Sequence, residues 1–304
     1  MDRKPIAITV GDPSGVGPEI IASWVSKNAA KASSAVVIGH EKFLSALPDS
    51  VGKLTIGDAG FEAVAGRPCP EGARVAFEAL KVAARGCTEG KFAAVVTAPI
   101  SKECMREVGF EYQGQTEFFA DSWGGTPVMS FAGTKFIVSL VTWHDPLKDV
   151  PKLLDFAKIA RAVGASAELA KKLRGVENPR IAVCGLNPHA GENGLIGREE
   201  IDLINPALEK LRGDFPNLSV SLPPDTVFER VLKGEFDCIV SMYHDQALAP
   251  LKAVEFDNAV NVSMNLPHLR VSPDHGTAFG IAGKGIANDG SFSRAFELAE
   301  KMVY

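Results

Sequence analysis

The chain alternates short apolar segments of strand length with longer segments of helical periodicity. Runs rich in β-branched residues occur at Ile6 to Val10, Ala35 to Ile38 and Ala93 to Thr97, and a glycine-rich turn after the first run leads into a helix expected from Pro18. Such alternation favours the α/β class, in which helices cover the faces of a parallel sheet. Because 304 residues exceed the usual size of one domain, two lobes are expected.

Three further segments have the spacing of amphipathic helices. They are Pro151 to Leu173, Ile201 to Leu211 and Phe292 to Met302, and Asp149 is placed to cap the first. The segment Val128 to Val141 is different, because it predicts two strands that turn near Gly133. This hairpin could serve as an arm that pairs with a second subunit.

Composition excludes several classes of function. A net charge of -5 without any Lys/Arg run argues against a nucleic-acid partner or an acidic membrane surface. No apolar run has the length of a signal-peptide core or a membrane span. The five cysteines form no Cys-x-x-Cys pair, which is typical of reduced thiols in a cytoplasmic protein.

Three of the six histidines follow apolar runs in the same way. His144 comes after Phe136 to Val141, His189 after Ile181 to Cys184, and His244 after Cys238 to Met242. Ligands gather beyond the carboxyl ends of parallel strands, so the three imidazoles could converge on one divalent cation. Each histidine could instead belong to an ordinary turn or helix start, because the spacing matches no compact zinc motif.

Several loops could bind an anionic ligand. Residues 11–19 join the first strand to the first helix through three glycines, although they match neither the dinucleotide fingerprint nor the Walker A loop. Residues 97–102 have the same strand-turn-helix form and end on Lys102, which could face a cleft or water. Gln115 and Thr116 suit a polar substrate and equally suit a helix N-terminus.

Two features follow the third histidine. Lys252, Asn261 and Arg270 could form a cradle for phosphate or carboxylate, or the two cations could simply lie on the surface. The glycine-rich stretch 274–288 is long for a connection, and its backbone could wrap an adenosine moiety or be a mobile surface loop.

Five motifs together resemble one family. Gly11-Asp12-Pro13-Ser14-Gly15-Val16-Gly17-Pro18-Glu19, Thr97-Ala98-Pro99-Ile100-Ser101-Lys102, Gly185-Leu186-Asn187-Pro188-His189-Ala190-Gly191-Glu192, Tyr243-His244-Asp245-Gln246 and Asp274-His275-Gly276-Thr277-Ala278 occur in family order. The chain is thereby similar to the 4-hydroxythreonine-4-phosphate dehydrogenases of pyridoxal phosphate biosynthesis, from its first strand to its last helix.

The resemblance implies a fold and an assembly. It implies two α/β/α lobes of the isopropylmalate-dehydrogenase type with the active-site cleft between them, and a homodimer whose active sites lie at the subunit interface. The implied lobes are residues 1–120 with 275–304, which bind the nucleotide, and residues 121–274, which bind metal and substrate and form the dimer. The expected ligands are NAD or NADP, one divalent cation (zinc, cobalt, magnesium or manganese) and a small anionic substrate that carries a phosphate.

The resemblance also assigns roles to residues. The metal positions are His144, His189 and His244, and the substrate positions are Gln115, Thr116, Lys252, Asn261 and Arg270. The cofactor positions are Gly11, Asp12, His275, Gly276, Thr277 and Asn288. Lys102 and Asp245 are candidates for the proton acceptor, and a water molecule on the metal is a third.

One residue departs from the family pattern. Relatives usually have histidine before the threonine, whereas this chain has Gln115, which hydrogen-bonds but carries no proton or positive charge. The implied activity is oxidation of 4-phosphooxy-L-threonine to a β-keto acid that decarboxylates to 3-amino-2-oxopropyl phosphate. Alternatives are threonate or erythronate 4-phosphate, a cis-dihydrodiol dicarboxylate, a metal-dependent hydrolase reaction, an acyl- or phosphotransferase reaction, and a silent binding protein.

Overall fold

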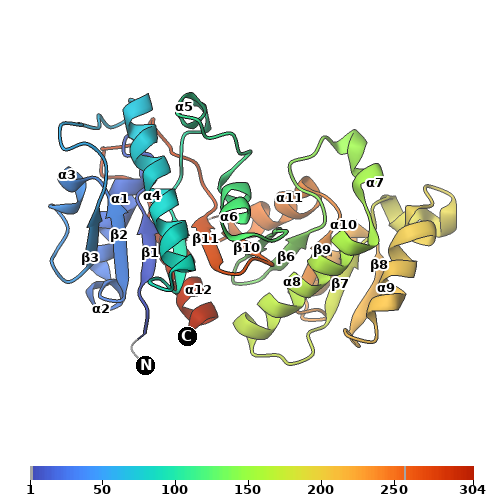
Figure 1. The fold of residues 1–304 in the computed structure, drawn as a ribbon. Helices are drawn as coiled ribbons and strands as arrows, with labels where there is room; N and C mark the ends of the chain where they lie inside the picture. The colour runs from blue at the N-terminus through green and yellow to red at the C-terminus, as the bar shows by residue number, and fades with distance from the viewer. Residues whose placement is uncertain (1–2, 257) are drawn as a thin grey trace. The chain divides into compact units, whose positions relative to one another are not determined.

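The computed structural model describes residues 3–256 and 258–304, which form two compact units. Unit 1 comprises Met1–Pro127 and Leu266–Tyr304, and unit 2 comprises Val128–Asn265. Both are mixed α/β structures, which confirms the expected fold class (Figure 1). The expected lobe boundaries at residues 120 and 275 stay a prediction about domains.

Unit 1 contains a parallel sheet in the order β3-β2-β1-β4-β11. Short β-branched runs form its inner strands because they are buried on both faces, as the fully buried β1 and β4 show. Its elements are β1 (Ile6–Thr9), α1 (Gly17–Lys27), α2 (Ala29–Ala32), β2 (Ala35–Gly39), α3 (Glu41–Leu44), β3 (Gly52–Thr55), α4 (Pro70–Thr88), β4 (Ala94–Thr97), α5 (Lys102–Glu107), α6 (Gln115–Trp123), β11 (Leu269–Pro273) and α12 (Gly290–Val303).

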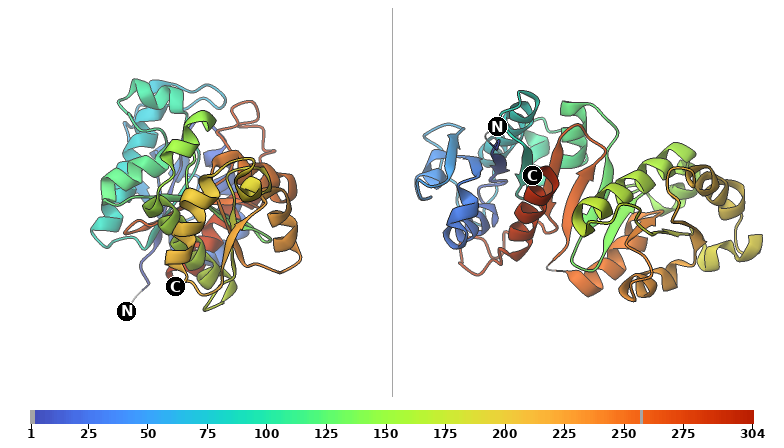
Figure 2. Two further views of the ribbon diagram at one scale, coloured as in Figure 1. Left: turned by 90° about the vertical axis from the view of Figure 1, so that its right-hand side faces the viewer. Right: turned by 90° about the horizontal axis from the view of Figure 1, so that it is seen from below.

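Helices cover both faces of the unit 1 sheet. One face packs against α4 and α6, in a core that includes Ala7, Val95 and Phe119. On the other side, the Trp24 ring of α1 lies 4.4 Å from the Phe296 ring of α12, measured between centroids. Figure 2 shows α12, in dark red, beside β11. The carboxyl ends of β1, β4 and β11 therefore lie at one edge of a rigid sheet.

Unit 2 contains strands in the order β10-β5-β6-β9-β7-β8. Strands β10, β5 and β6 pair antiparallel, and β6, β9, β7 and β8 pair parallel. Its elements are β5 (Val128–Ala132), β6 (Ile137–Leu140), η1 (Leu147–Asp149), α7 (Val150–Leu153), α8 (Phe156–Arg174), β7 (Ile181–Cys184), η2 (Pro188–Gly194), η3 (Glu200–Ile204), α9 (Asn205–Leu211), β8 (Leu218–Leu222), α10 (Pro224–Leu232), β9 (Cys238–Ser241), α11 (His244–Glu255) and β10 (Val260–Met264).

The predicted hairpin is present, and one buried carboxylate holds its turn. Strands β5 and β6 pair from Ser130 with Ser139 to Ala132 with Ile137. The Glu255 carboxylate, at the end of α11, accepts hydrogen bonds from the backbone N–H groups of Thr134 (2.7 Å), Lys135 (2.8 Å) and Phe136 (2.9 Å). A side chain at Gly133 would collide with this carboxylate, so glycine is required there.

The predicted helix from Pro151 is wrong at its beginning. The chain leaves helical geometry at Leu154, and α8 begins at Phe156. Asp155, and not Asp149, caps α8, because its Oδ1 accepts from the backbone N–H of Lys158 at 2.7 Å. The apolar spacing continues from the short α7 into the long α8, so periodicity did not reveal the break.

Candidate functional site

The three histidines follow three neighbouring parallel strands. His144 lies beyond β6, His189 lies in η2 beyond β7, and His244 is the first residue of α11 beyond β9. Because β9 pairs with both β6 and β7 in parallel, the carboxyl ends of all three strands lie at one edge of the unit 2 sheet. This agrees with the placement that the sequence predicts.

Two of these histidines have a carboxylate on Nδ1. The His244 Nδ1 lies 2.7 Å from Asp245 Oδ1, and the His189 Nδ1 lies 3.1 Å from Glu192 Oε2. A carboxylate that accepts from Nδ1–H fixes the tautomer and leaves Nε2 with its lone pair for a ligand. The donor set therefore has the chemistry that zinc, cobalt or manganese requires.

The histidines are not gathered into a complete metal site. The rings of His144 and His244 lie 6.0 Å apart, measured between centroids and inclined by 37°. Among residues 3–256 and 258–304, no three His, Cys, Asp or Glu side chains are arranged to hold a metal ion. The structure therefore brings two of the three rings close, and the three-histidine metal site stays a prediction.

The turn that carries His189 has an unusual backbone. Residues 189–193 all have positive φ, with 53° at His189 and 52° at Ala190. Left-handed backbone at a residue with a Cβ costs about 1 kcal/mol, so other contacts must hold this turn. The buried Glu200 is one, since Oε1 accepts from the Asn187 backbone N–H at 2.8 Å and Oε2 accepts from the Asn187 side-chain amide at 3.0 Å.

A buried guanidinium lies at the N-terminus of α6 in unit 1. Arg270, on β11, is 5% exposed and donates to Thr97 Oγ1 from Nε at 3.0 Å and from Nη2 at 2.8 Å. Its Nη1 donates to Thr116 Oγ1 at 3.4 Å. Burial lowers the pKa of Arg270 to about 10, and the negative charge of Glu117 acts in the opposite direction. A cation beside a helix N-terminus creates an electropositive place that an anionic group would stabilise.

Gln115 is the first residue of α6, next to Thr116. Its Nε2 donates to the Ala98 carbonyl oxygen at 3.1 Å. Its Oε1 is a buried acceptor with no hydrogen-bond partner within the described chain. The predicted substrate residues Gln115, Thr116 and Arg270 are thus neighbours in unit 1.

The β1–α1 loop packs against the loop that follows β11. The Val16 backbone N–H donates to the Thr277 carbonyl at 2.9 Å, and a Cβ at Gly15 would lie 2.9 Å from the same oxygen. Glu19 of α1 accepts from the backbone N–H groups of Gly283 (2.9 Å) and Ala287 (3.0 Å). The residues predicted to bind the cofactor therefore come from two loops that contact each other in unit 1.

Asp12 is buried within the β1–α1 loop. Its Oδ1 accepts from the Ser14 backbone N–H at 2.9 Å, whereas its Oδ2 is buried and makes no hydrogen bond to the described residues. Burial raises the pKa of the Asp12 carboxyl, and the Ser14 hydrogen bond lowers it by less. The Ser14 hydroxyl is also buried without a hydrogen bond to the part of the chain that is described. These atoms give the loop polar groups that a bound ligand could satisfy.

The other predicted site residues have varied settings. Lys102 is exposed at the start of α5, and Ser101 caps that helix. Lys252 lies on α11, and Asn261 is buried in β10, so both belong to unit 2. His275 and Asn288 make local contacts: His275 Nδ1 lies 3.0 Å from the Gly276 carbonyl, and Asn288 Oδ1 accepts from Gly290 N–H at 2.8 Å.

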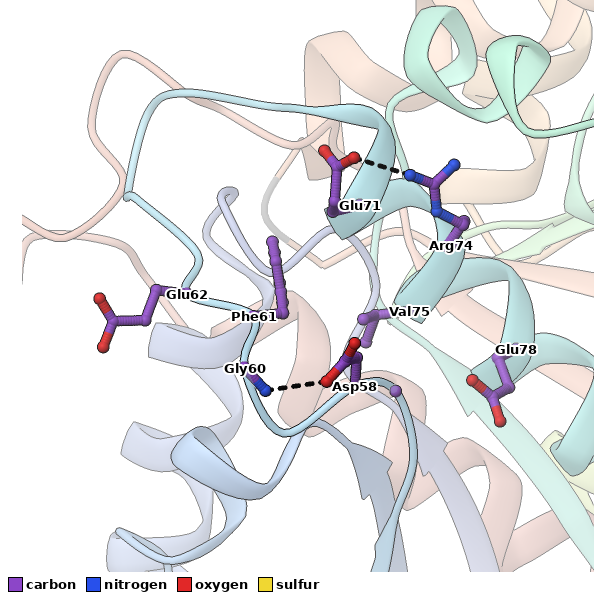
Figure 3. Close-up of a pocket in the computed structure, with 9 residues that line it drawn as sticks. Asp58, Gly60, Phe61, Glu62, Glu71, Arg74, Val75 and Glu78 are labelled. Atoms are coloured by element: carbon purple, nitrogen blue, oxygen red, sulfur yellow. Dashed lines mark hydrogen bonds and ion pairs between the residues drawn. The ribbon is translucent and has the colours of Figure 1, made fainter.

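A pocket of about 630 Å³ lies elsewhere in unit 1 (Figure 3). The residues that line it come from the β3–α4 connection and from α4, and they include four carboxylates, those of Asp58, Glu62, Glu71 and Glu78. None of the predicted site residues lines it. Its acidic lining makes it a poor place for a phosphorylated ligand.

No cysteine is among the predicted site residues. All five cysteines are free thiols, and burial raises the pKa of Cys184 and of Cys238 to about 12. Buried thiols with such values are poor nucleophiles at neutral pH.

Sequence reasoning missed two residues that support these sites. Thr97 was noticed only as part of a turn, although its hydroxyl accepts two hydrogen bonds from Arg270. Glu200, which holds the His189 turn, lies one residue before the segment Ile201 to Leu211 that predicts a helix, and the sequence indicates no role for it. Thr97 ends a buried strand with a polar side chain, and that pattern could have identified it.

Comparison with known proteins identifies the family. Residues 10–299 match the family model described as pyridoxal phosphate biosynthetic protein PdxA. A 4-hydroxythreonine-4-phosphate dehydrogenase of Erythrobacter litoralis is 39% identical over 98% of this chain and 96% of its own. The solved structure of a putative 4-hydroxythreonine-4-phosphate dehydrogenase from Salmonella typhimurium matches with a TM-score of 0.87 at 33% identity, over 99% of this chain and 100% of its own.

A more distant solved structure is named for a different activity. A terephthalate 1,2-cis-dihydrodiol dehydrogenase from Burkholderia xenovorans LB400 matches with a TM-score of 0.73 at 25% identity, over 99% of this chain and 98% of its own. The family model and the curated relatives at 39% identity both span nearly the whole chain. The chain therefore belongs to the PdxA family of pyridoxal phosphate biosynthetic proteins.

Proposed function

We propose that the protein is an NAD(P)-dependent and divalent-metal-dependent dehydrogenase that oxidises 4-phosphooxy-L-threonine in pyridoxal phosphate biosynthesis. The product is a β-keto acid, which loses carbon dioxide to give 3-amino-2-oxopropyl phosphate. The observation that carries this proposal, within a family of that name, is the buried Arg270 at the N-terminus of α6. Such a place suits a small anionic substrate.

The proposed reaction balances without a further reactant. Oxidation removes a hydride from C3 and a proton from its hydroxyl, and the electron pair goes to NAD(P)⁺. Decarboxylation then breaks the bond between C1 and C2, and a proton replaces the carboxylate on C2. When bound, the dinucleotide supplies the hydride acceptor and the cation supplies a Lewis acid for the substrate oxygens.

The residues of the chain would orient the substrate and receive its proton. Arg270 and Thr116 would hold an anionic group of the substrate, with Lys252 and Asn261 as further contacts. Of the two candidate proton acceptors, Asp245 already contacts His244 Nδ1, whereas Lys102 is exposed on α5. The two glycine-containing loops around Gly15 and Thr277 would bind the dinucleotide through their backbone N–H groups.

The metal would be held by His144, His189 and His244 through Nε2. Support comes from their placement after adjacent parallel strands and from the carboxylates on two of the three Nδ1 atoms. Binding would require the His189 turn to bring its ring to the other two. We also propose a homodimer, with the β5–β6 hairpin as the arm, and a cytoplasmic location, which five free thiols favour.

The second candidate function is that of a family member that oxidises another substrate. Gln115 replaces the usual histidine of the family, and one structural relative is named for a cis-dihydrodiol. Threonate 4-phosphate, erythronate 4-phosphate and a cis-dihydrodiol dicarboxylate are therefore alternative substrates. A metal-dependent hydrolase is the alternative from a different class, because three imidazoles with an open position also activate water.

One turnover panel separates these candidates. The protein is incubated with a divalent metal, with NAD or NADP, and with each of the four compounds, while NADH absorbance and carbon dioxide are measured. We expect NADH and carbon dioxide in equal amounts with 4-phosphooxy-L-threonine. Phosphate release without NADH formation would show that the protein is a hydrolase and not a dehydrogenase. Faster turnover of another compound would show that this compound, and not 4-phosphooxy-L-threonine, is the substrate.

A further inference from the structure

The two polar atoms of the Gln115 side chain have different roles. Its Nε2 donates to the Ala98 carbonyl at 3.1 Å, and only the amide nitrogen can donate to a carbonyl, so the orientation of the amide is fixed. Its Oε1 therefore points away from that bond and is a buried acceptor that no described residue satisfies. A buried acceptor without a donor costs free energy, which a ligand that supplies a proton would recover.

Charged groups of both signs lie near this turn of α6, because Glu117 is in the same first turn and its negative charge acts on the buried Arg270. Gln115 and Thr116 form the first turn of α6, and the Thr116 hydroxyl meets the buried Arg270 guanidinium. Arg270 and Thr116 carry donors that an anion could use, whereas Gln115 Oε1 has no proton to offer it. An unprotonated phosphate oxygen placed against Oε1 would bring two acceptors together, which is unfavourable where water is excluded.

We propose that Gln115 Oε1 accepts a hydrogen bond from a hydroxyl or ammonium group on C2 of the substrate, while the anionic groups bind to other residues. The C3 hydroxyl is the group that is oxidised, so the C2 substituent is the remaining donor on 4-phosphooxy-L-threonine and on the threonate and erythronate phosphates. Gln115 is then a specificity-determining residue. This inference rests on the proposed function for the place of the substrate beside α6.

The inference also predicts the effect of a histidine at position 115. A histidine there can offer an N–H to an anion, whereas the Gln115 Oε1 can only accept. Position 115 therefore changes from a hydrogen-bond donor, with histidine, to a hydrogen-bond acceptor, with glutamine. We expect Gln115→His to bind inorganic phosphate more tightly than the unchanged protein, by about tenfold or more.

The test compares two compounds that differ in one donor. The first is 4-phosphooxy-L-threonine, and the second is 3-hydroxy-4-phosphooxybutanoate, which keeps the carboxylate, the phosphate and the oxidised hydroxyl but has no donor on C2. Binding is measured by calorimetry without cofactor, and kcat/KM is measured with it. The variant is Gln115→Met, which keeps the length of the side chain and removes the acceptor. Gln113→Met, at an exposed glutamine two residues earlier, is the matched control.

We expect Gln115→Met to lose the ability to discriminate between the two compounds. The unchanged protein and Gln113→Met should bind the compound with the C2 donor at least about tenfold more tightly, and Gln115→Met should bind both within about threefold. Inorganic phosphate should bind Gln115→Met and the unchanged protein equally. A melting temperature for each variant shows whether loss of the bond to Ala98 has disturbed the fold.

Three results would overturn the inference. The first is that the unchanged protein binds both compounds equally, and the second is that Gln115→Met weakens the binding of both compounds equally. The third is that Gln115→Met weakens the binding of inorganic phosphate tenfold, in which case Gln115 holds the phosphate through its second N–H. Failure of the proposed function gives a different pattern, in which neither compound is oxidised. If neither compound binds, the inference is tested by the binding of inorganic phosphate alone. It then requires that Gln115→His binds phosphate more tightly than Gln113→His does.

Discussion

Individual charges in this protein are stabilised by very different surroundings. Arg270 is buried beside the Thr97 and Thr116 hydroxyl groups at a helix N-terminus, and the negative charge of Glu117 stabilises its charge against the cost of burial. Asp237 is buried in a bidentate contact with Arg180, with Nε–Oδ2 at 3.0 Å and Nη2–Oδ1 at 2.8 Å. We propose that the first arrangement belongs to a ligand site, whereas the second joins the beginnings of β7 and β9.

We predict that Asp237→Asn lowers the free energy of unfolding at pH 7 by about 1 kcal/mol, a modest value because Arg180 is half exposed. The hydrogen bonds from Arg180 hold the pKa of Asp237 below the ordinary 3.8, so the stabilisation is present above that pH. It is lost as the pH falls through the lower value of the folded protein. Urea unfolding of both proteins from pH 7 to pH 2.5 should therefore show a difference that shrinks in acid.

Asp202→Asn is the matched control for that measurement. Asp202 also makes a two-bond contact with an arginine, Arg198, but both side chains are more than half exposed. We expect Asp202→Asn to change the free energy of unfolding by less than about 0.5 kcal/mol. An equal effect of the two substitutions would show that burial of Asp237 adds nothing.

At the scale of elements, short segments are held by carboxylates that are distant in sequence. Glu255 at the end of α11 holds the β5–β6 turn, and Glu200 holds the left-handed η2 turn. Neither segment could keep its backbone geometry through its own propensity. Contacts between elements therefore determine where the hairpin arm and His189 lie.

We predict that Glu255→Gln destabilises the protein by about 2 to 3 kcal/mol. The carboxylate accepts three backbone N–H groups, and an amide can present only one oxygen to them, so a buried donor is left unsatisfied. Chemical denaturation measures the loss. Glu229→Gln, at an exposed position of α10, should change the stability by less than about 0.5 kcal/mol, and similar values for the two would contradict the role of Glu255.

A second prediction concerns η2. Ala190→Gly should stabilise the protein by up to about 1 kcal/mol, because glycine adopts the observed φ of 52° without a Cβ penalty. Ala157→Gly, at an exposed helical position in α8, should have the opposite sign. Thermal unfolding compares them, and destabilisation by Ala190→Gly would show that the turn is not strained.

At the scale of the whole molecule, the predicted site residues are divided between the two units. Unit 1 carries Gln115, Thr116, Arg270 and the two loops assigned to the dinucleotide, while unit 2 carries the three histidines. No helix of the described residues is long and apolar enough to cross a membrane. The proposed activity depends on residues of both units.

We predict that removing metal separates the functions of the two units. After dialysis against a chelator, NADH formation should fall at least about 100-fold and should return when manganese, cobalt or zinc is added. Dinucleotide binding, measured by calorimetry, should change little, because its predicted residues lie in unit 1. Full activity in chelated protein would contradict the metal requirement.

The sequence by itself determined the class of the fold and the strands that precede the three histidines, the β1–α1 loop and the 97–102 turn. Burial on both faces requires apolar β-branched runs, so β1, β4, β7 and β9 are readable from local composition, as are the polar residues that follow them. The five motifs likewise determined the family. The break before α8 was not readable, because apolar spacing continues across Leu154.

Only the tertiary structure decided which of these residues are neighbours. It placed Thr97 and Thr116 around Arg270, and it fixed the Gln115 amide through a carbonyl that lies 17 residues earlier in the chain. It also gave His189 a left-handed turn held by Glu200. The reason is physical: hydrogen bonds and charge burial depend on distances between segments, and local propensity contains no information about those distances.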